Sequence, residues 1–458
     1  MVFSSITFLL YFFPLVWLVY RLVPRSAENA VLVAASLVFY AWGEPVYLLL
    51  MLLSIGMNYA FGLLIDRARE EGMSPAKRRF HLVMGVAANL SFLVFFKYAG
   101  FLFSLFAPAN APEIALPVGI SFYTFQALSY VIDVYREKVR PRKDLLSFAL
   151  YISLFPQLIA GPIVQYKEIE PQLSHHPGSR KMLQEGLWLF LWGLAKKVLI
   201  ANAAGQMFTE IRGAGGAGVF ASWLGAFAFT LQIYYDFSGY SDMATGIGRM
   251  FGFRFPQNFD APYTSRSVTE FWRRWHITLG SWFREYVYIP LGGNRVSRGR
   301  HIRNLLVVWL LTGIWHGAGW NFILWGLYYG LLLILEKYVI GDWLDTHPLP
   351  GRIYTAFVVI VGWMIFAITD MGELGRYLLS MAGAVRNAGA LSLRRLLSGY
   401  GAVLAAGTAG LIPQVSRIRK VIFSNYKVLA FVIVAVLFVL CVASLIRDSY
   451  NPFLYFRF

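Results

Sequence analysis

The sequence predicts an all-α polytopic membrane protein, and three observations support that prediction. Hydrophobic residues make up 58% of the chain and charged residues only 14%, whereas soluble domains carry about 25% charged residues. Apolar runs close to the length of a membrane crossing recur along the whole chain. The net charge of +17 is concentrated in clusters between those runs. We therefore expect a multi-pass protein whose surface contacts membrane lipid, and we expect no nucleic-acid partner.

The apolar runs predict roughly ten to twelve membrane-embedded segments, because a crossing helix needs about 20 residues. The first run has no basic segment before it and no small-residue cleavage site after it, so we interpret it as a retained helix and not as a signal peptide. The runs lie near residues 2–20, 29–41, 46–65, 82–106, 115–134, 146–165, 186–204, 217–251, 305–335, 353–369, 397–412 and 428–446.

Several of these runs contain residues that break helices. Gly43 and Pro45 interrupt the second run, Lys97 and Gly100 the fourth, and the stretch FPQLIAGPI the sixth. Non-helical backbone at membrane depth is tolerated only where it is buried in protein or lines a wet cavity. The breaks therefore predict an interior chamber or re-entrant segments, not a plain helix bundle.

The basic clusters predict the orientation in the membrane. By the positive-inside rule they face the cytoplasm, which places the N-terminus outside. The loop APANAPEI, residues 107–114, has no Lys or Arg and is expected outside the cytoplasm. The clusters are Arg21 and Arg25; Arg67, Arg69, Lys77, Arg78 and Arg79; Arg136, Lys138, Arg140, Arg142 and Lys143; and Arg417, Arg419 and Lys420.

Cysteine content and repeats limit the organisation of the chain. The single cysteine, Cys441, excludes a disulfide framework and a cysteine-based zinc site, and we predict no metal site. The sequence has no internal repeat and no low-complexity tract. We therefore expect one domain over residues 1–458.

The richest polar stretch is residues 253–303, where arginines alternate with Phe, Trp and Tyr. One interpretation is a basic cytoplasmic or re-entrant segment whose aromatic residues anchor it at the interface. The other is that planar guanidinium groups and aromatic faces hold a phosphorylated ligand, such as one that carries a nucleotide or phosphopantetheine. The nine arginines are Arg254, Arg266, Arg273, Arg274, Arg284, Arg295, Arg298, Arg300 and Arg303.

Two histidines are candidate functional residues. His316 is the only side chain between Leu305 and Leu335 that changes charge near neutral pH. Burial of an ionisable group at membrane depth costs free energy, which makes it a functional-site hypothesis. His276, beside arginines and tryptophans, is either an interfacial structural residue or a second member of the site. Asp236 and Asp242 fall on different faces of a regular helix, so we interpret them as separate features.

Three blocks of the sequence resemble the signature of the membrane-bound O-acyltransferase family, in particular its bacterial branch that O-acetylates exopolysaccharides. They are DFSGYSDMATGIGRMFGF, NFDAPYTSRSVTEFWRRWHITLGSWFREYVYIPLGGNR and TGIWHGAGWNFILWG. The stretches PVGISFYTFQALSYVIDVYR and FPQLIAGPIVQY and the terminal NPFLYFRF extend the resemblance over nearly the whole chain. The arginine-rich block is specific, whereas WHG alone would be a weak signal.

The resemblance implies a fold and a site. It implies a ring of transmembrane helices around a thinned centre, with a cytoplasmic funnel that leads to a histidine. The family's near-invariant histidine matches His316, and its more variable polar position matches His276. Candidates for substrate binding are Arg273, Arg274, Arg284, Trp315 and Asn321. Asn321 is either a donor to a developing oxyanion or a polar residue at a helix start.

The implied reaction is acyl transfer from a thioester to a hydroxyl. Neutral His316 would take the hydroxyl proton as general base and return a proton to the departing thiolate. Apolar surroundings would exclude water, and Gly317 and Gly319 would let backbone approach the ligand. The resemblance implies acetyl-CoA as the donor substrate, with no bound cofactor.

The resemblance also implies partners and a location. This chain has no long soluble segment for a polysaccharide, so we expect it to pass acetyl groups to a periplasmic acetyltransferase or an acetyl carrier within a polysaccharide biosynthesis machinery. The polymer would be an exopolysaccharide such as alginate, and the location the bacterial inner membrane. One alternative is D-alanyl transfer to teichoic acid from a carrier protein. An alternative of another class is a secondary transporter, since broken helices and buried ionisable groups also describe transporters.

Overall fold

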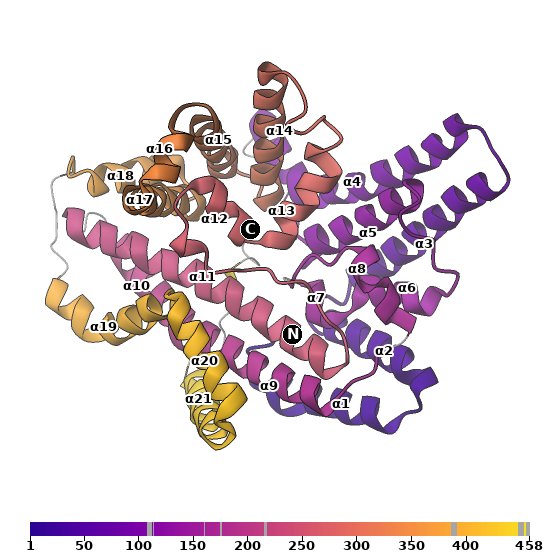
Figure 1. Cartoon of the computed structure of the whole chain (residues 1–458), viewed down its shortest axis with the longest axis horizontal. Helices are drawn as coiled ribbons and strands as arrows, with labels where there is room; N and C mark the ends of the chain where they lie inside the picture. Colours follow the sequence, from indigo (N-terminus) through magenta and orange to yellow (C-terminus); the bar gives the residue numbers. More distant parts are fainter. Residues whose placement is uncertain are drawn as a thin grey trace. The chain divides into compact units, whose positions relative to one another are not determined.

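The computed structural model describes residues 1–107, 112, 114–159, 161–174, 176–214, 218–385, 392–447 and 453–454. Every regular element in these ranges is a helix (Figure 1), which confirms the predicted all-α class. The loop 107–114 and the terminal NPFLYFRF lie largely outside the described residues, so the predicted placement of that loop stays a prediction.

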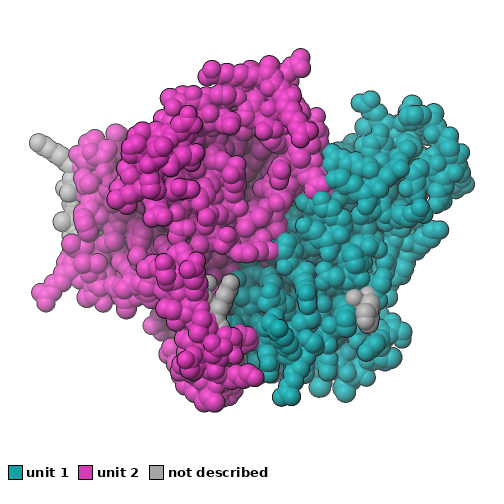
Figure 2. Space-filling model, in the orientation of Figure 1, with its two compact units in different colours: residues 1–190, 241–256 teal, residues 191–240, 257–458 magenta. Residues whose placement is uncertain are grey.

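The chain forms two compact units, each built from two stretches of sequence (Figure 2). Unit 1 comprises residues 1–190 and 241–256, and unit 2 comprises residues 191–240 and 257–458. Helices α9, Arg180–Ala195, and α11, Gly218–Met250, contribute residues to both units. The predicted single domain over residues 1–458 stays a prediction.

Unit 1 is a helical assembly in which α3, α4 and α5 pack on one another and α2 packs on α6. Short π and 3-10 turns, Phe8–Phe12 and Arg25–Ala27, flank its first helix. The helices are α1 Phe13–Leu22, α2 Glu28–Ala41, α3 Leu48–Glu70, α4 Pro75–Phe106, α5 Ile120–Tyr135, α6 Leu145–Ser153, α7 Phe155–Leu158 and α8 Tyr166–Ser174.

Two of the predicted helix breaks are confirmed in unit 1. The chain leaves α2 at Ala41 and enters α3 at Leu48, so the break falls around Gly43 and Pro45. Helix α6 ends at Ser153, just before FPQLIAGPI; α7 makes one short turn over Phe155–Leu158, and residues 161–165 are buried but not helical. Side chains supply its hydrogen bonds: Tyr151 lies 3.2 Å from the Val164 carbonyl oxygen. Protein groups thus replace the water that would otherwise satisfy this backbone.

The predicted break at Lys97 and Gly100 is wrong. Helix α4 runs without interruption from Pro75 to Phe106. The Lys97 ammonium donates to Ser121 Oγ at 3.3 Å, so the long side chain finds a polar partner without disturbing the helix. One glycine costs a helix only about 1 kcal/mol, which the other hydrogen bonds of a long helix outweigh.

Unit 2 holds the arginine-rich stretch and the C-terminal half of the chain. The stretch does not form a surface loop, because its short helices bury Phe271 and Trp275. The elements are η4 Lys196–Ala201, α10 Asn202–Gly213, η5 Pro262–Thr264, α12 Val268–Arg274, α13 Ile277–Phe283, η6 Arg284–Tyr288, α14 Arg298–His316, α15 Trp320–Leu335, η7 Glu336–Ile340, α16 Gly341–Thr346, α17 Pro348–Ala367, α18 Met371–Met381, α19 Leu393–Gly410, α20 Pro413–Asn425 and α21 Lys427–Arg447.

Six helices among the described residues are long and apolar enough to cross a membrane, or seven if the bent pair α19 and α20 counts as one span. This agrees with a multi-pass protein. Other predicted apolar runs form shorter or more polar helices. The first run forms a helix over Phe8–Leu22, which at 1.5 Å per residue reaches about 22 Å, less than the roughly 30 Å of a bilayer core.

A buried ion pair joins η4 to α11 within unit 2. Lys197 Nζ lies 2.5 Å from Asp236 Oδ1, and both side chains are almost fully buried. The other carboxylate oxygen of Asp236 accepts the backbone N–H of Leu454 at 2.7 Å. The neighbouring Phe453 packs against Phe237, one residue after Asp236, with ring centroids 5.7 Å apart. Asp236 belongs to unit 2 and Asp242 to unit 1, so neither unit contains both carboxylates.

Helices α14 and α15 form a close antiparallel pair that ends in the loop after His316 (Figure 1). Gly313 and Gly326 allow this approach. A Cβ added at Gly326 would lie 2.5 Å from the Trp309 carbonyl oxygen and 3.3 Å from the Gly313 Cα. Glycine pairs of this kind let helix backbones approach closely in membrane proteins. The crossing therefore fixes the position of His316, three residues after Gly313.

We expect Gly313→Ala to destabilise this pair by about 1–3 kcal/mol, the usual cost of overpacking. An added Cβ would collide with the Phe322 carbonyl oxygen, which is backbone and cannot move aside. The matched control is Gly299→Ala in the first turn of α14, where an added Cβ meets no atom within 4 Å. Thermal unfolding in detergent should give a lower Tm for the first variant only, and equal Tm values would contradict the packing argument.

Candidate active site

Two adjoining cavities of unit 2 bring the predicted histidines together. The inner cavity, about 280 Å³, is lined by both His276 and His316 among largely apolar neighbours. The outer cavity, about 470 Å³, is lined by more polar side chains. Because they share lining residues, the two cavities adjoin, and we refer to them together as the path. The shared residues are Trp272, Arg273, Gly280, Arg284, Tyr288 and Leu305.

His316 is the last residue of α14, and aromatic rings hold its imidazole. The side chain is buried. Trp325 and Phe366 approach its ring edge to face, with centroids 5.0 and 5.2 Å away. Such contacts restrict the ring without adding a charge nearby. The imidazole is therefore held in an apolar wall of the inner cavity. A group that is to exchange protons with a ligand there needs such a fixed position.

His276 lies in a strained turn between α12 and α13. Its φ of +44° falls in the left-handed region, which costs a residue with a Cβ roughly 1–3 kcal/mol and is common at functional sites. The backbone around it is tied down, since the Ile277 N–H donates to the Asn258 carbonyl oxygen at 3.0 Å. Phe237 packs edge to face on the His276 ring at 4.6 Å. Strain and packing together fix the direction of this imidazole.

Asn258 determines which nitrogen of His276 carries the proton. Asn258 Oδ1 accepts the Thr278 N–H at 3.3 Å and the Thr278 hydroxyl at 3.0 Å, so this atom is an acceptor. It also lies 3.1 Å from His276 Nδ1, which must then be the donor. Burial lowers the pKa of His276 to about 3. The ring is therefore neutral, with the proton on Nδ1 and a lone pair on Nε2.

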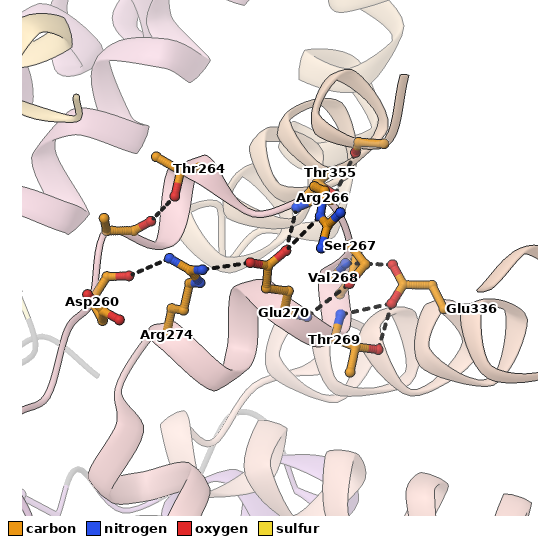
Figure 3. Close-up of polar contacts among 12 residues, drawn as sticks. Asp260, Thr264, Arg266, Ser267, Val268, Thr269, Glu270, Arg274, Glu336 and Thr355 are labelled. Atoms are coloured by element: carbon orange, nitrogen blue, oxygen red, sulfur yellow. Dashed lines mark hydrogen bonds and ion pairs between the residues drawn. The ribbon is translucent and has the colours of Figure 1, made fainter. Parts of the chain in front are cut away.

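The three predicted arginines separate into two groups. Arg273 and Arg284 line both cavities, and neither forms an ion pair with a described carboxylate. Arg274 points elsewhere: it pairs with Glu270 Oε1 at 2.7 Å and its guanidinium lies 3.5 Å from the Asp260 carbonyl oxygen (Figure 3). This corrects the expectation that all three act alike, because consecutive residues of a helix face different directions.

Glu336 positions α12, the helix that carries Arg273 and Arg274, and the sequence analysis did not single it out. Its carboxylate accepts the N–H groups of Val268 at 2.5 Å and Thr269 at 2.8 Å, together with the Thr269 hydroxyl at 2.7 Å (Figure 3). It caps the first turn of α12 from another element, where a negative charge is favourable. The available signal was its place as the first charged residue after the run 305–335.

Trp315 and Asn321 do not line either cavity. Trp315 is buried beside both histidines, with its ring 6.0 Å from that of His276. Asn321 lies in the first turn of α15, where its amide donates to the carbonyl oxygens of Ile365 at 3.3 Å and Phe366 at 3.1 Å. These contacts favour the helix-start interpretation of Asn321. A Cβ at Gly317 would collide with the Phe322 ring, so this glycine serves packing here.

Comparison with known proteins identifies the family. The model of the membrane-bound O-acyltransferase family matches residues 79–371, more than half of the chain. A probable alginate O-acetylase AlgI of Azotobacter vinelandii is 37% identical over 503 aligned positions that cover 100% of both chains. A peptidoglycan O-acetyltransferase of Helicobacter pylori is 38% identical over 74% of this chain and 70% of its own.

A more distant relative is a teichoic acid D-alanyltransferase of Streptococcus thermophilus, 29% identical over 48% of this chain and 56% of its own. The family model and the relatives agree with the apolar helices of the structure. The chain is therefore an O-acyltransferase of the membrane-bound O-acyltransferase family.

Proposed function

We propose that this enzyme takes acetyl groups from cytoplasmic acetyl-CoA and delivers them across the inner membrane for O-acetylation of an exopolysaccharide such as alginate. The observation that supports this most directly is one path lined by His276 and His316 at its inner end and by Arg273 and Arg284 along its length. The acceptor would be a separate periplasmic acetyltransferase or an acetyl carrier. Relatives named as O-acetylases match the chain over its full length, which favours acetyl over D-alanyl.

The inner cavity suits thioester chemistry. Neutral His316 accepts the proton of an acceptor hydroxyl while the oxygen attacks the thioester carbon, and the C–S bond then breaks. The proton on His316 passes to the departing thiolate, so the imidazole is restored. His276 Nε2, kept unprotonated by Asn258, accepts a hydrogen bond from the incoming hydroxyl and orients it. Aromatic walls exclude water, which limits hydrolysis of the thioester.

The path also suits a phosphopantetheine arm. The indole Nε1 of Trp272 is buried and has no hydrogen-bond partner among the described residues, and Trp272 lines both cavities. A buried donor without an acceptor is unfavourable. An amide carbonyl of a pantetheine chain would supply that acceptor, while Arg273 and Arg284 would pair with phosphate.

The test of the function is a donor comparison with purified protein in proteoliposomes. We expect release of CoA from acetyl-CoA when an acceptor preparation is present, measured as free thiol. The competing activity is D-alanyl transfer, tested with a D-alanyl carrier protein. Thiol release from that carrier with none from acetyl-CoA would overturn the acetyl assignment. The transporter alternative no longer applies, because the family is one of acyltransferases.

His316→Ala should lower acetyl transfer by roughly 10²–10⁴-fold, the usual contribution of a general base. The change removes the base and adds neither charge nor bulk, so expression and Tm should stay near those of the unmodified protein. The matched control is His347→Ala, at an exposed histidine. Turnover within a few-fold of the unmodified enzyme would contradict the role of His316.

The arginines give a prediction with an internal control. Arg273→Gln and Arg284→Gln should each raise the KM for acetyl-CoA roughly tenfold, the value of a lost charge-assisted hydrogen bond, and reduce its salt dependence. Arg274→Gln should leave this KM nearly unchanged, because Arg274 pairs with Glu270. Steady-state kinetics at two salt concentrations measure the effect. Equal changes in all three variants would contradict a donor-binding role for the two cavity arginines.

The Asn258–His276 pair predicts a pH effect. With a pKa of about 3, His276 stays neutral across the working pH range. In Asn258→Asp a carboxylate beside Nδ1 favours the imidazolium, so the pKa of His276 rises. As the pH falls, Nε2 then becomes protonated at a higher pH and can no longer accept a hydrogen bond from the acceptor hydroxyl. The acid limb of kcat against pH should therefore move to higher pH.

Two further variants test the same pair. His276→Ala and Asn258→Ala should both lower kcat, and the double variant should be little worse than His276→Ala, because residues that act as one unit are not additive. His276→Asn should recover part of the loss through hydrogen bonding, more than His276→Phe does. Additive losses, or superimposed pH profiles for Asn258→Asp and the unmodified enzyme, would remove His276 from the chemistry.

A further inference from the structure

The proposed reaction does not yet use a hydrogen-bonded chain of three side chains, two of which line the outer cavity. Tyr338, in η7, has its hydroxyl 2.6 Å from Nδ1 of His301 in α14. Nε2 of the same ring lies 2.9 Å from the hydroxyl of Tyr288, the last residue of η6. Tyr288 lines both cavities and His301 the outer one. The hydrogen-bonded chain thus runs from Tyr338, behind the cavity lining, through His301 to Tyr288 in the lining of both cavities.

A neutral imidazole allows this chain two directions, and the distances favour one of them. A hydrogen bond donated by a hydroxyl is typically shorter than one donated by a ring N–H. The 2.6 Å contact therefore fits a Tyr338 hydroxyl that donates to Nδ1, and the 2.9 Å contact fits an Nε2–H that donates to Tyr288. The guanidinium of Arg298 lies over the Tyr338 ring at 4.6 Å, which makes that phenol a better donor.

When His301 Nε2–H donates to the Tyr288 oxygen, the Tyr288 hydroxyl can donate its own proton to a ligand. The Tyr288 oxygen accepts from His301, so its own O–H is free of that contact and borders the cavities. Burial raises the pKa of Tyr288, which keeps the phenol protonated. Burial and Lys337 lower the pKa of His301, which keeps that ring neutral and able to accept from Tyr338. Hydrogen bonds in series polarise one another, so this phenol is a stronger donor than an isolated one.

The outer cavity is positively charged around that donor. Its lining includes Arg273, Arg284 and Lys337, and no carboxylate is among its lining residues. Three cations and a polarised hydroxyl suit an oxyanion with several acceptor atoms, which describes a phosphate better than a single carbonyl. The inner cavity shares Arg273 and Arg284 but not Lys337, and it carries the two histidines and otherwise a largely apolar lining. A ligand with its phosphate outside and its reactive end inside matches both.

We propose that Tyr338, His301 and Tyr288 form a one-way relay that presents the Tyr288 proton to a phosphate oxygen of the donor's phosphopantetheine arm. This proposal rests on the proposed acyl transfer from a thioester donor. It adds the residues that bind the phosphate of that donor. Free CoA and a carrier-borne arm share this phosphate, and the experiment below separates them. Tyr288 is thus a binding residue, and His301 and Tyr338 are positioning residues that act through it.

The experiment measures Kd for three probes on the intact protein in nanodiscs: pantetheine, 4′-phosphopantetheine and CoA. The unmodified protein should bind 4′-phosphopantetheine at least tenfold more tightly than pantetheine. Tyr288→Phe should remove most of that ratio, and Tyr338→Phe part of it. The matched control is Tyr328→Phe, whose hydroxyl donates to the Val358 carbonyl oxygen away from both cavities. Tighter binding of CoA than of 4′-phosphopantetheine indicates free CoA, and equal binding a carrier-borne arm.

His301 variants separate the relay from mere support of the fold. A glutamine keeps one acceptor and one donor, so His301→Gln should preserve much of the phosphate ratio, while His301→Leu should abolish it at similar Tm. The double variant Tyr288→Phe with Tyr338→Phe should be no worse than Tyr288→Phe alone, because the distal tyrosine acts only through the proximal one.

Three results would overturn the relay. They are equal affinity of the unmodified protein for pantetheine and 4′-phosphopantetheine, an equal loss for both probes in Tyr288→Phe, and no effect of Tyr338→Phe. Failure of the proposed function is distinguishable from these. It would appear as absent acetyl transfer from acetyl-CoA in a protein that still prefers the phosphorylated probe.

Discussion

A polar group that is buried at membrane depth needs its partner inside the protein, because the bilayer core offers no water to replace one. The site depends on this constraint at two atoms. Asn258 Oδ1 accepts the protons that hold the turn at His276. Glu336 accepts the N–H groups that open α12. Without these acceptors the backbone of Val268 and Thr269 would face apolar surroundings unsatisfied, at a cost of several kcal/mol per group.

The same constraint explains why catalytic and structural roles are hard to separate in unit 2. Glu336 lies next to Lys337, which lines the outer cavity, and its carboxylate orients the helix that places Arg273. A change at Glu336 would therefore move Arg273, and with it alter the proposed donor binding, without touching the ligand. To interpret a distant substitution in this enzyme, KM and kcat must therefore be measured separately. A single activity value does not distinguish the two effects.

The sequence predicted the helical class and two helix breaks, because glycine and proline give a local signal, and it singled out His316 as the one ionisable residue of an apolar run. For His276, which shares the inner cavity, the sequence carried only the family resemblance as a signal. It could not predict Asn258, Glu336 or Tyr338, whose partners lie 18, 68 and 37 positions away in the chain. Such pairings follow from tertiary packing. For the same reason the pattern could not tell Arg273 from Arg274.

The ion pair of Lys197 and Asp236 has a consequence for how the protein is made. Asp236 obtains its second partner from the backbone of Leu454, which is synthesised 218 residues later. Until then the helices lie in the translocon or the bilayer, and the Asp236 carboxylate lacks the hydrogen bond from Leu454. Phe453 arrives with Leu454 and closes on Phe237, the ring that supports His276. The packing around His276 is therefore complete only after Phe453 and Leu454 have been synthesised.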